Sequence, residues 1–335
     1  MASQRLERLL ESVIQAKKIL ILPHNDPDPD AIVSAVALRY LLAQKLGIHG
    51  QIVYRGIIGR AENRALVRYL NNPLRPLKTS DLDQATHVAL VDTQPSAGNN
   101  AWPASFRATI VIDHHPSRQR VANVSFADIR PEIGATSTIM TQYLRAAGLD
   151  LPSSLATALF YGIKTDTKGL SRSTDPADAA AYLYLQPRLE VESLAEIERA
   201  QVPAAYFKSF VDTLAATRVY GKTAISYVGS MEYPDMAAEM ADLLARLEEI
   251  EWVICTGVYQ MTLLLAVRAP GRRGDAGLLA QAIVGTEGAA GGHNTMAGGQ
   301  MPLKSNDLTR ILAQIRQRTL NHLSIGSNTV SQSLI

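Results

Sequence analysis

The sequence predicts an α/β fold: a parallel sheet with helices on both faces, followed by a smaller α/β domain with a mixed sheet. The chain has 335 residues, which is more than one ordinary domain holds. In the first half, short and nearly continuous apolar runs alternate with helical segments, the pattern of a parallel sheet covered on both faces. In the second half, two pairs of strands are each separated by a two-residue turn, which is typical of antiparallel hairpins.

The first half begins with an amphipathic helix within residues 1–18. Apolar runs then predict four strands, at residues 19–23, 52–54, 87–91 and 109–112. Helical patterns follow at residues 31–46, 136–147 and 154–164. Ligands of such sheets bind beyond the carboxyl ends of the strands, so the loops that follow these runs are the expected place for a site.

The second half pairs residues 217–220 with 223–228 and residues 251–258 with 261–268 as hairpins. Helices are predicted at residues 235–249, 275–284 and 307–323. The expected domains are therefore a catalytic domain at 1–190, a helical linker at 191–212 and a substrate-binding domain at 213–325. Residues 326–335 form a polar tail that is expected to be frayed.

Composition excludes several classes of protein. Lys and Arg number 33 and Asp and Glu number 31, so the net charge of +2 argues against a protein that coats long nucleic acid. A single cysteine, Cys255, excludes an internal disulfide framework and a cysteine-rich zinc module. No apolar run approaches the roughly 20 residues that cross a membrane, and no signal-peptide core is present. A cytoplasmic protein with no membrane partner is expected.

Acidic and histidine residues follow the predicted strands of the first half. They are His24, Asp28 and Asp30 after the first strand, Asp92 after the third, Asp113, His114 and His115 after the fourth, and Asp166 just beyond the helix at 154–164. Parallel strands end at one edge of their sheet, so these side chains are expected to converge. A simpler explanation exists for a single aspartate, since Asp30 stands directly before a helix and is a candidate for its N-cap.

Several carboxylates in one place repel each other and raise each other's pKa unless a cation lies between them. Imidazole and carboxylate ligands without a thiolate suit Mn²⁺, Mg²⁺, Fe²⁺ or Zn²⁺ with open coordination positions. Two such ions about 3.5–4 Å apart can hold both the attacking and the leaving oxygen of a phosphoryl transfer. The residues of the first half therefore predict a metal centre.

The second half offers candidate anion ligands. Gly291, Gly292 and His293 open a glycine-rich loop at residues 290–299, where the backbone can approach a ligand closely and its N–H groups can bind an anion. Arg268 ends a predicted strand and could hold the same anion through two hydrogen bonds. The alternatives are an ordinary turn for the glycines and an exposed ion pair for Arg268.

Five segments in this order resemble the motifs of the DHH phosphoesterase superfamily and its DHH-associated C-terminal domain. They are His-x-x-Pro-Asp-x-Asp-Ala at 24–31, Val-Asp-Thr at 91–93, Asp-His-His at 113–115, Gly-Ile-Lys-Thr-Asp-Thr at 162–167, and the Gly-Gly-His segment at 291–299. The resemblance extends over most of the chain. It implies two divalent metal ions, by preference Mn²⁺.

The resemblance also implies a role for each matching residue. One metal would be held by His24, Asp28 and Asp92, and the other by Asp30, Asp92, His114 and Asp166. His115 would touch the scissile phosphate, Asp92 would orient the attacking water, and Asp113 would orient the histidines. The far phosphate of the substrate would be held by Arg268, Gly291, Gly292 and His293.

In size the chain most resembles the branch of nano-RNases and 3′-phosphoadenosine 5′-phosphate (pAp) phosphatases. This implies a phosphoesterase that hydrolyses short oligoribonucleotides, and pAp as well, by two-metal activation of water. Two alternatives stay open: a phosphodiesterase for the dinucleotide pApA or cyclic di-AMP, and a non-catalytic nucleotide-binding protein. Relatives often dimerise, so a homodimer is also compatible with the resemblance.

Overall fold

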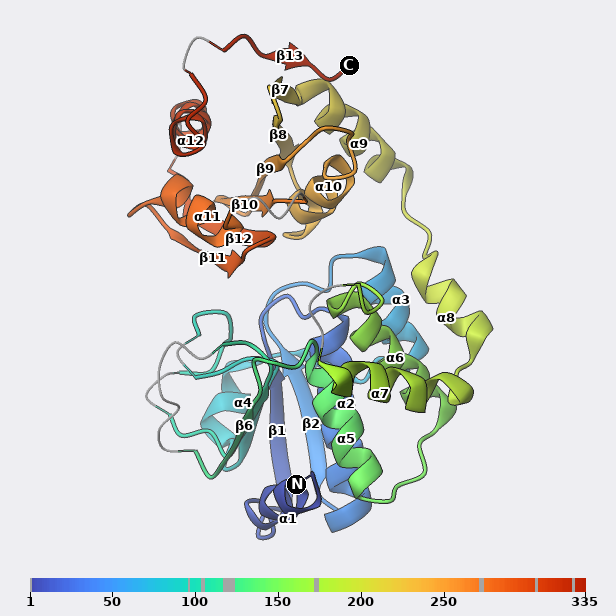
Figure 1. Ribbon diagram of the computed structural model, residues 1–335. Coiled ribbons are helices and arrows are strands. Elements are labelled where there is room, and N and C mark those ends of the chain that lie inside the picture. The colour runs from blue at the N-terminus through green and yellow to red at the C-terminus, as the bar shows by residue number, and fades with distance from the viewer. Residues whose placement is uncertain are drawn as a thin grey trace. The chain divides into compact units, whose positions relative to one another are not determined.

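The computed structural model describes residues 2–95, 97–103, 106–116, 124–171, 175–270, 274–304, 307–326 and 329–335. The chain divides into two compact units, Met1–Ala200 and Gln201–Ile335 (Figure 1). This division lies within the segment 191–212 that the sequence marks as a connection. Each unit has its own sheet and its own apolar core.

The first unit contains a six-stranded sheet in which all neighbouring strands are parallel. Its strands are β1 (Lys18–Pro23), β2 (His49–Tyr54), β3 (Leu74–Pro76), β4 (Val88–Val91), β5 (Ile110–Asp113) and β6 (Phe126–Ile129). Their order is β3-β2-β1-β4-β5-β6. The predicted parallel α/β fold and its four strands are confirmed. The two edge strands, β3 and β6, were not predicted, since runs of three and four residues carry too little periodicity.

Alternate residues of each strand face opposite sides of this sheet, and both sides are buried. Ile19 and Ile21 of β1 belong to the large core beneath the helices, while Leu20 and Leu22 pack in a second cluster around Trp102. Figure 1 shows α2 and α5 on one side of β1 and β2. Burial on both faces explains why the strands read as continuous apolar runs.

The helices of the first unit are α1 (Ala2–Glu11), α2 (Pro29–Leu46), α3 (Ala61–Tyr69), α4 (Thr79–Gln84), α5 (Thr136–Ala146), α6 (Ser153–Asp166), α7 (Pro176–Leu185), the short 3₁₀ turn η1 (Gln186–Arg188) and α8 (Val191–Glu198). The predicted helices of this unit are present as α1, α2, α5 and α6, whereas α3, α4 and α7 were not predicted. Throughout the described part of the chain, no helix has both the length and the apolar character needed to cross a membrane.

Helix α2 is capped by Asp28, so the alternative explanation of Asp30 as its N-cap is wrong. The side chain of Asp28, not Asp30, accepts the hydrogen bond from the N–H of Ala31, at 3.0 Å, and Pro29 occupies the first turn. The helix ends at Gly47, whose φ of 65° is left-handed and suits glycine. Asp30 therefore lies inside the first turn, where its carboxylate is available to the neighbouring helix.

Helices α2, α5 and α6 pack against one another closely. A side chain at Gly162 of α6 would lie 2.5 Å from Oγ of Ser137 in α5 and 2.7 Å from Cγ2 of Val33 in α2, so only glycine fits there. This close approach lets the last residue of α6, Asp166, lie beside residues that follow the strands.

The second unit contains a seven-stranded mixed sheet of order β11-β12-β10-β9-β8-β7-β13, in which only the pair β8 and β9 is parallel. Its strands are β7 (Arg218–Tyr220), β8 (Thr223–Ser230), β9 (Trp252–Tyr259), β10 (Thr262–Arg268), β11 (Ala289–His293), β12 (Met296–Pro302) and β13 (Gln332–Ser333). Its helices are α9 (Ala204–Ala216), α10 (Met236–Leu244), α11 (Ala276–Val284) and α12 (Leu308–His322). The predicted mixed sheet and both predicted hairpins are confirmed.

Two expectations for the second unit were wrong. The tail at 326–335 is not entirely frayed, because Gln332 and Ser333 pair with β7. The glycine-rich segment is not a loop over most of its length: β11 and β12 form an antiparallel hairpin that turns at Asn294 and Thr295. Because β12 also pairs with β10, the hairpin is part of the sheet, and this pairing outweighed the low strand propensity of glycine.

Candidate metal centre

The candidate site lies where the strand order of the first sheet reverses, between β1 and β4. Loops that leave two such strands diverge in opposite directions, which leaves room for a ligand at their carboxyl ends. His24 directly follows β1 and Asp92 directly follows β4. Asp92 has a left-handed φ of 59°, which is uncommon for a residue other than glycine and frequent at functional sites.

His24, Asp28 and Asp92 form the first group of candidate ligands. Nε2 of His24 lies 3.7 Å from Oδ1 of Asp28 and 3.5 Å from Oδ2 of Asp92. The other ring nitrogen, Nδ1, lies 2.7 Å from the backbone oxygen of Asn25. A proton on Nδ1 is held by that carbonyl, so the lone pair of Nε2 points at the carboxylates, as a metal ligand requires.

His114 has the same arrangement on the other side of Asp92. Its Nδ1 lies 3.1 Å from the backbone oxygen of Ile133. Its Nε2 lies 3.2 Å from Oδ2 of Asp166 and 3.6 Å from Oδ1 of Asp92. This Nε2 is buried and makes no hydrogen bond, which is unusual for a polar atom inside a protein. A cation between it and the carboxylates would satisfy it, so the residues fit a metal ion.

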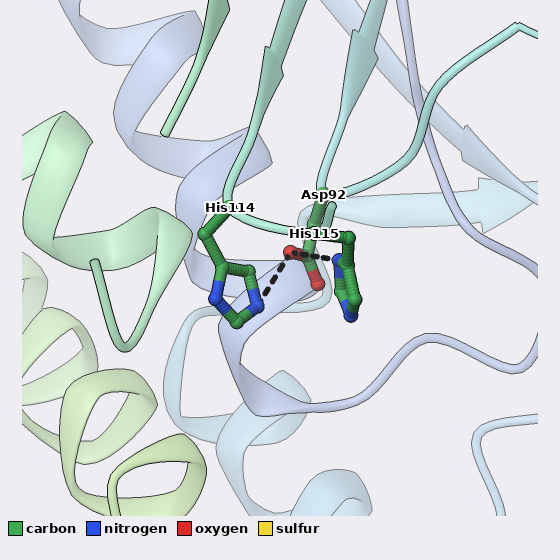
Figure 2. Close-up of side chains that lie close together, drawn as sticks. All are labelled: Asp92, His114 and His115. Carbon is green, nitrogen blue, oxygen red and sulfur yellow. Dashed lines mark ion pairs between the residues drawn. The ribbon is translucent and has the colours of Figure 1, made fainter. Parts of the chain in front are cut away.

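Figure 2 shows how the two adjacent imidazoles surround one carboxylate. His114 and His115 both turn toward Oδ1 of Asp92, at 3.6 Å and 3.7 Å, and their ring centroids are 4.3 Å apart. The side chain of Asp92 is almost completely buried beneath them. Asp92 is therefore placed to be shared between two neighbouring ligand groups.

Asp30 completes the second group from the first turn of α2. Its two oxygens accept hydrogen bonds from the backbone N–H groups of Thr136, at 2.6 Å, and Ser137, at 2.7 Å. These are the first N–H groups of α5, which have no partner within their own helix. Thr136 also donates its hydroxyl to Oδ1 of Asp92, at 2.7 Å. One threonine thus orients two candidate metal ligands.

Sequence reasoning did not find Thr136 and Ser137, nor the residue that anchors them. Asp178 is fully buried and accepts hydrogen bonds from the N–H of Gly134, at 2.8 Å, and the hydroxyl of Thr138, at 2.6 Å. The start of α5 is therefore held from both sides. The available signal was the pair Thr-Ser at the start of a predicted helix, but such pairs are common at any helix start.

Within the described residues, three groups have ligand atoms that all lie within 4.8 Å of one another: His24, Asp28 and Asp92; Asp30, His114 and Asp166; and Asp92, His114 and His115. The first two groups contain the residues that the resemblance assigns to two metals, and the third joins them. The structure therefore brings every predicted metal ligand together. Their binding of metal remains a prediction.

The imidazoles of the site hold protons tightly while no cation is bound. Burial lowers the pKa of His24, but the carboxylates of Asp28 and Asp92 raise it by a larger amount. The net pKa therefore lies well above the ordinary value. Burial likewise lowers the pKa of His114, and Asp166 and Asp92 again raise it well above that value. A divalent cation would take the place of these protons.

The carboxylates differ among themselves. Burial raises the pKa of Asp30 well above its ordinary value, and the charges of Asp92 and Asp166 add to this effect. Burial also raises the pKa of Asp92, but the three surrounding histidines outweigh it and the net pKa is lowered. Asp92 is therefore ionised and its negative charge stabilises the neighbouring imidazolium groups. The ionised form of Asp30 is the one that a bound cation would stabilise most.

Asp113 and His115 form a hydrogen-bonded pair, in which His115 also belongs to the third ligand group. Asp113 is buried, and its Oδ1 accepts from the backbone N–H of His115, at 3.1 Å, and lies 2.9 Å from the ring Nδ1. The side chain of His115 is 41% exposed, so substrate can reach it. Burial lowers the pKa of His115, whereas Asp113 and Asp92 raise it, and the net pKa is above the ordinary value.

The predicted substrate-binding residues lie in the second unit. Arg268 is buried and its Nε donates to Oδ1 of Asp242, at 2.7 Å, so an anion would have to compete with that carboxylate. Gly291 and Gly292 lie in β11, where a side chain at Gly292 would come within 2.4 Å of Cα of Ala297. His293 ends β11, and its side chain lies outside the described residues. Anion binding by these residues remains a prediction.

Residues 18–163 match the family described as DHH family, N-terminal domain. An uncharacterized protein of Methanocaldococcus jannaschii is 35% identical over 298 residues, which cover 88% of this chain and 60% of that protein. A probable manganese-dependent inorganic pyrophosphatase of Streptococcus pyogenes is 26% identical over 216 residues, which cover 63% of this chain and 65% of that protein. The matches thus span less than two thirds of either relative.

Among solved structures, an exopolyphosphatase-related protein from Bacteroides fragilis superposes with a TM-score of 0.74. The superposition covers 96% of this chain and 98% of that protein, at 14% sequence identity. At this identity the likeness extends to the fold. The likeness in fold therefore extends over nearly the whole length of both chains.

Proposed function

Because the chain belongs to the DHH family through residues 18–163, we propose that it is a hydrolase of phosphoester bonds that uses two divalent metal ions. The observation that supports this most strongly is the set of ligand groups on either side of Asp92. Imidazole and carboxylate donors without thiolate suit Mn²⁺. A similar Streptococcus pyogenes protein carries the name of a manganese-dependent enzyme, which also favours Mn²⁺.

When bound in these groups, two cations would activate water and neutralise the charge that develops on the phosphoryl oxygens. The residues of the chain prepare the site for this chemistry. His24 and His114 present Nε2 because backbone carbonyls hold their other ring nitrogen. Asp92 is held in place by the hydroxyl of Thr136. His115, with its raised pKa, would donate a proton or a hydrogen bond to the leaving oxygen.

We propose short oligoribonucleotides and pAp as the substrates. Five motifs over residues 24–299 resemble those of the DHH superfamily, and in its two-domain size the chain most resembles the nano-RNase and pAp-phosphatase branch. A net charge of +2 does not favour long nucleic acid, which is held through many phosphate contacts. Inorganic pyrophosphate is the second candidate, since a similar Streptococcus pyogenes protein is named a pyrophosphatase.

A substrate panel with Mn²⁺ tests this proposal. It contains RNA of two, five and 24 nucleotides, pAp, pApA, cyclic di-AMP and inorganic pyrophosphate. We expect kcat/KM for the two shorter RNAs to exceed that for the 24-nucleotide RNA by at least about tenfold, an energy difference of about 1.4 kcal/mol. Equal values for all three RNAs would contradict the preference for short substrates. No turnover of any phosphorus compound would contradict the hydrolase itself.

Uptake of Mn²⁺ is expected to release protons and to weaken as the pH falls. An imidazole must be neutral to bind a metal, and the pKa values of His24 and His114 lie well above the ordinary value in the metal-free site. Each displaced proton should change the apparent affinity about tenfold per pH unit below those pKa values. Calorimetry in two buffers of different ionisation enthalpy counts the protons, and a count of zero at neutral pH would contradict the prediction.

The metal-free protein should show the opposite pH dependence. A histidine whose pKa is raised on folding contributes stability that is fully present below its unfolded pKa of about 6.5. That contribution is lost as the pH rises through the folded value. With a chelator present, protonated His24 and His114 should therefore raise the thermal midpoint at low pH, and this effect should disappear as the pH rises. At high pH, bound Mn²⁺ would stabilise the protein in their place.

A further inference from the structure

Gln94 lies two residues beyond Asp92 and is almost completely buried, with 6% of its surface exposed. Its side-chain nitrogen donates to Oδ2 of Asp113, at 2.7 Å, and to the backbone oxygen of His115, at 2.9 Å. Both partners are acceptors, so the nitrogen rather than the oxygen of the amide must face them. Both side-chain N–H groups of Gln94 thus donate to the segment 113–115.

The carboxylate of Asp113 lies between Gln94 and the ring of His115. Oδ2 accepts from Gln94, while Oδ1 accepts from the backbone N–H of His115 and faces ring Nδ1. A carboxylate held on both oxygens cannot rotate. It therefore keeps a proton on Nδ1 of His115 and fixes the orientation of the ring. Nε2, the other ring nitrogen, then faces away from Asp113.

Gln94 is itself held by neighbours on its own loop. Its backbone oxygen accepts from Nδ2 of Asn100, at 2.8 Å, and the same amide donates to the hydroxyl of Thr93, at 2.9 Å. Thr93 donates in turn to Oδ1 of Asn99, whose backbone oxygen accepts from the N–H of Asn25, next to His24. These bonds join the segments that follow β1, β4 and β5.

We propose that Gln94 is a positioning residue that fixes Asp113 and, through it, the tautomer and orientation of the His115 ring. The inference rests on the proposed function, in which His115 acts on the leaving oxygen. Gln94 belongs to none of the three ligand groups. Its loss should therefore affect turnover more than metal or substrate binding.

The test compares Gln94→Met, which keeps the length of the side chain but has no donor, with Gln51→Met at an exposed position of β2. We expect Gln94→Met to lower kcat about 10- to 100-fold, the effect typical of residues that orient a reactive group. KM and the Kd for Mn²⁺ should change less than about threefold. Gln51→Met should behave as the unsubstituted protein. Unchanged kcat, or a loss of Mn²⁺ affinity as large as the loss of kcat, would overturn the proposal.

A second readout does not depend on activity. NMR of metal-free protein labelled with ¹⁵N in its histidines reports which ring nitrogen of His115 carries the proton. At a pH high enough for the His115 ring to be neutral, we expect Nδ1–H as the dominant form, and a mixture of forms in Gln94→Met and in Gln94→Glu, which places an acceptor against Asp113. The same dominant form in all three proteins would overturn the proposal. If the unsubstituted protein hydrolyses no substrate, the proposed function fails, and the NMR result still decides the role of Gln94.

Discussion

Substitution of Asp92 by asparagine is expected to lower phosphoester turnover by at least about 10³-fold. Asp92 is the residue that joins the group of His24 and Asp28 to the group containing His114. Asparagine keeps the size of the side chain but removes the charge, so both cations would be bound more weakly. A loss of several kcal/mol of metal-based stabilisation corresponds to this factor.

Turnover and Mn²⁺ affinity of Asp92→Asn are measured beside those of Asp83→Asn, an exposed aspartate on α4. The control should match the unsubstituted protein in both. The fold of Asp92→Asn should persist, because the side-chain oxygen of asparagine can still accept the hydrogen bond from the hydroxyl of Thr136. Turnover within tenfold of the unsubstituted protein, with Mn²⁺ in excess, would contradict the placement of the site at Asp92.

Substitution of Asp30 by alanine is expected to damage both the site and the fold. It removes a ligand from the group of His114 and Asp166, so Mn²⁺ affinity and turnover should fall. It also leaves the N–H groups of Thr136 and Ser137 buried without an acceptor. Each such loss costs about 1–3 kcal/mol, so the loss of both should lower the free energy of unfolding by about 2–6 kcal/mol.

Denaturant unfolding with a chelator present isolates the structural part of this effect. Asp30→Ala should unfold at lower denaturant concentration than Asp30→Asn, whose side-chain oxygen can still accept one of the two hydrogen bonds. Asp83→Ala serves as the matched control at an exposed position. Equal stability of Asp30→Ala and Asp83→Ala would show that the carboxylate does not hold the start of α5.

The local sequence predicted the strands that carry the site and the residues that follow them. Runs such as 19–23 and 88–91 are apolar throughout because both faces of the sheet are covered, and this property is visible without any tertiary information. The prediction failed where strand pairing decided the outcome. The glycines at 291 and 292 became strand residues by pairing with β12, and residues 332–333 became ordered by pairing with β7.

The sequence by itself determined the class of fold, the family and the chemical types of the candidate ligands. The sequence determined these properties because apolar periodicity is local, and because the loops that follow parallel strands all lie at one edge of the sheet. Only the tertiary structure decided which aspartate caps α2 and which accepts the N–H groups of α5. Asp30 and Thr136 are 106 residues apart, and Gln94 and Asp113 are 19 apart. Hydrogen bonds over such separations depend on how helices and loops pack, and that packing leaves no pattern in the neighbouring residues.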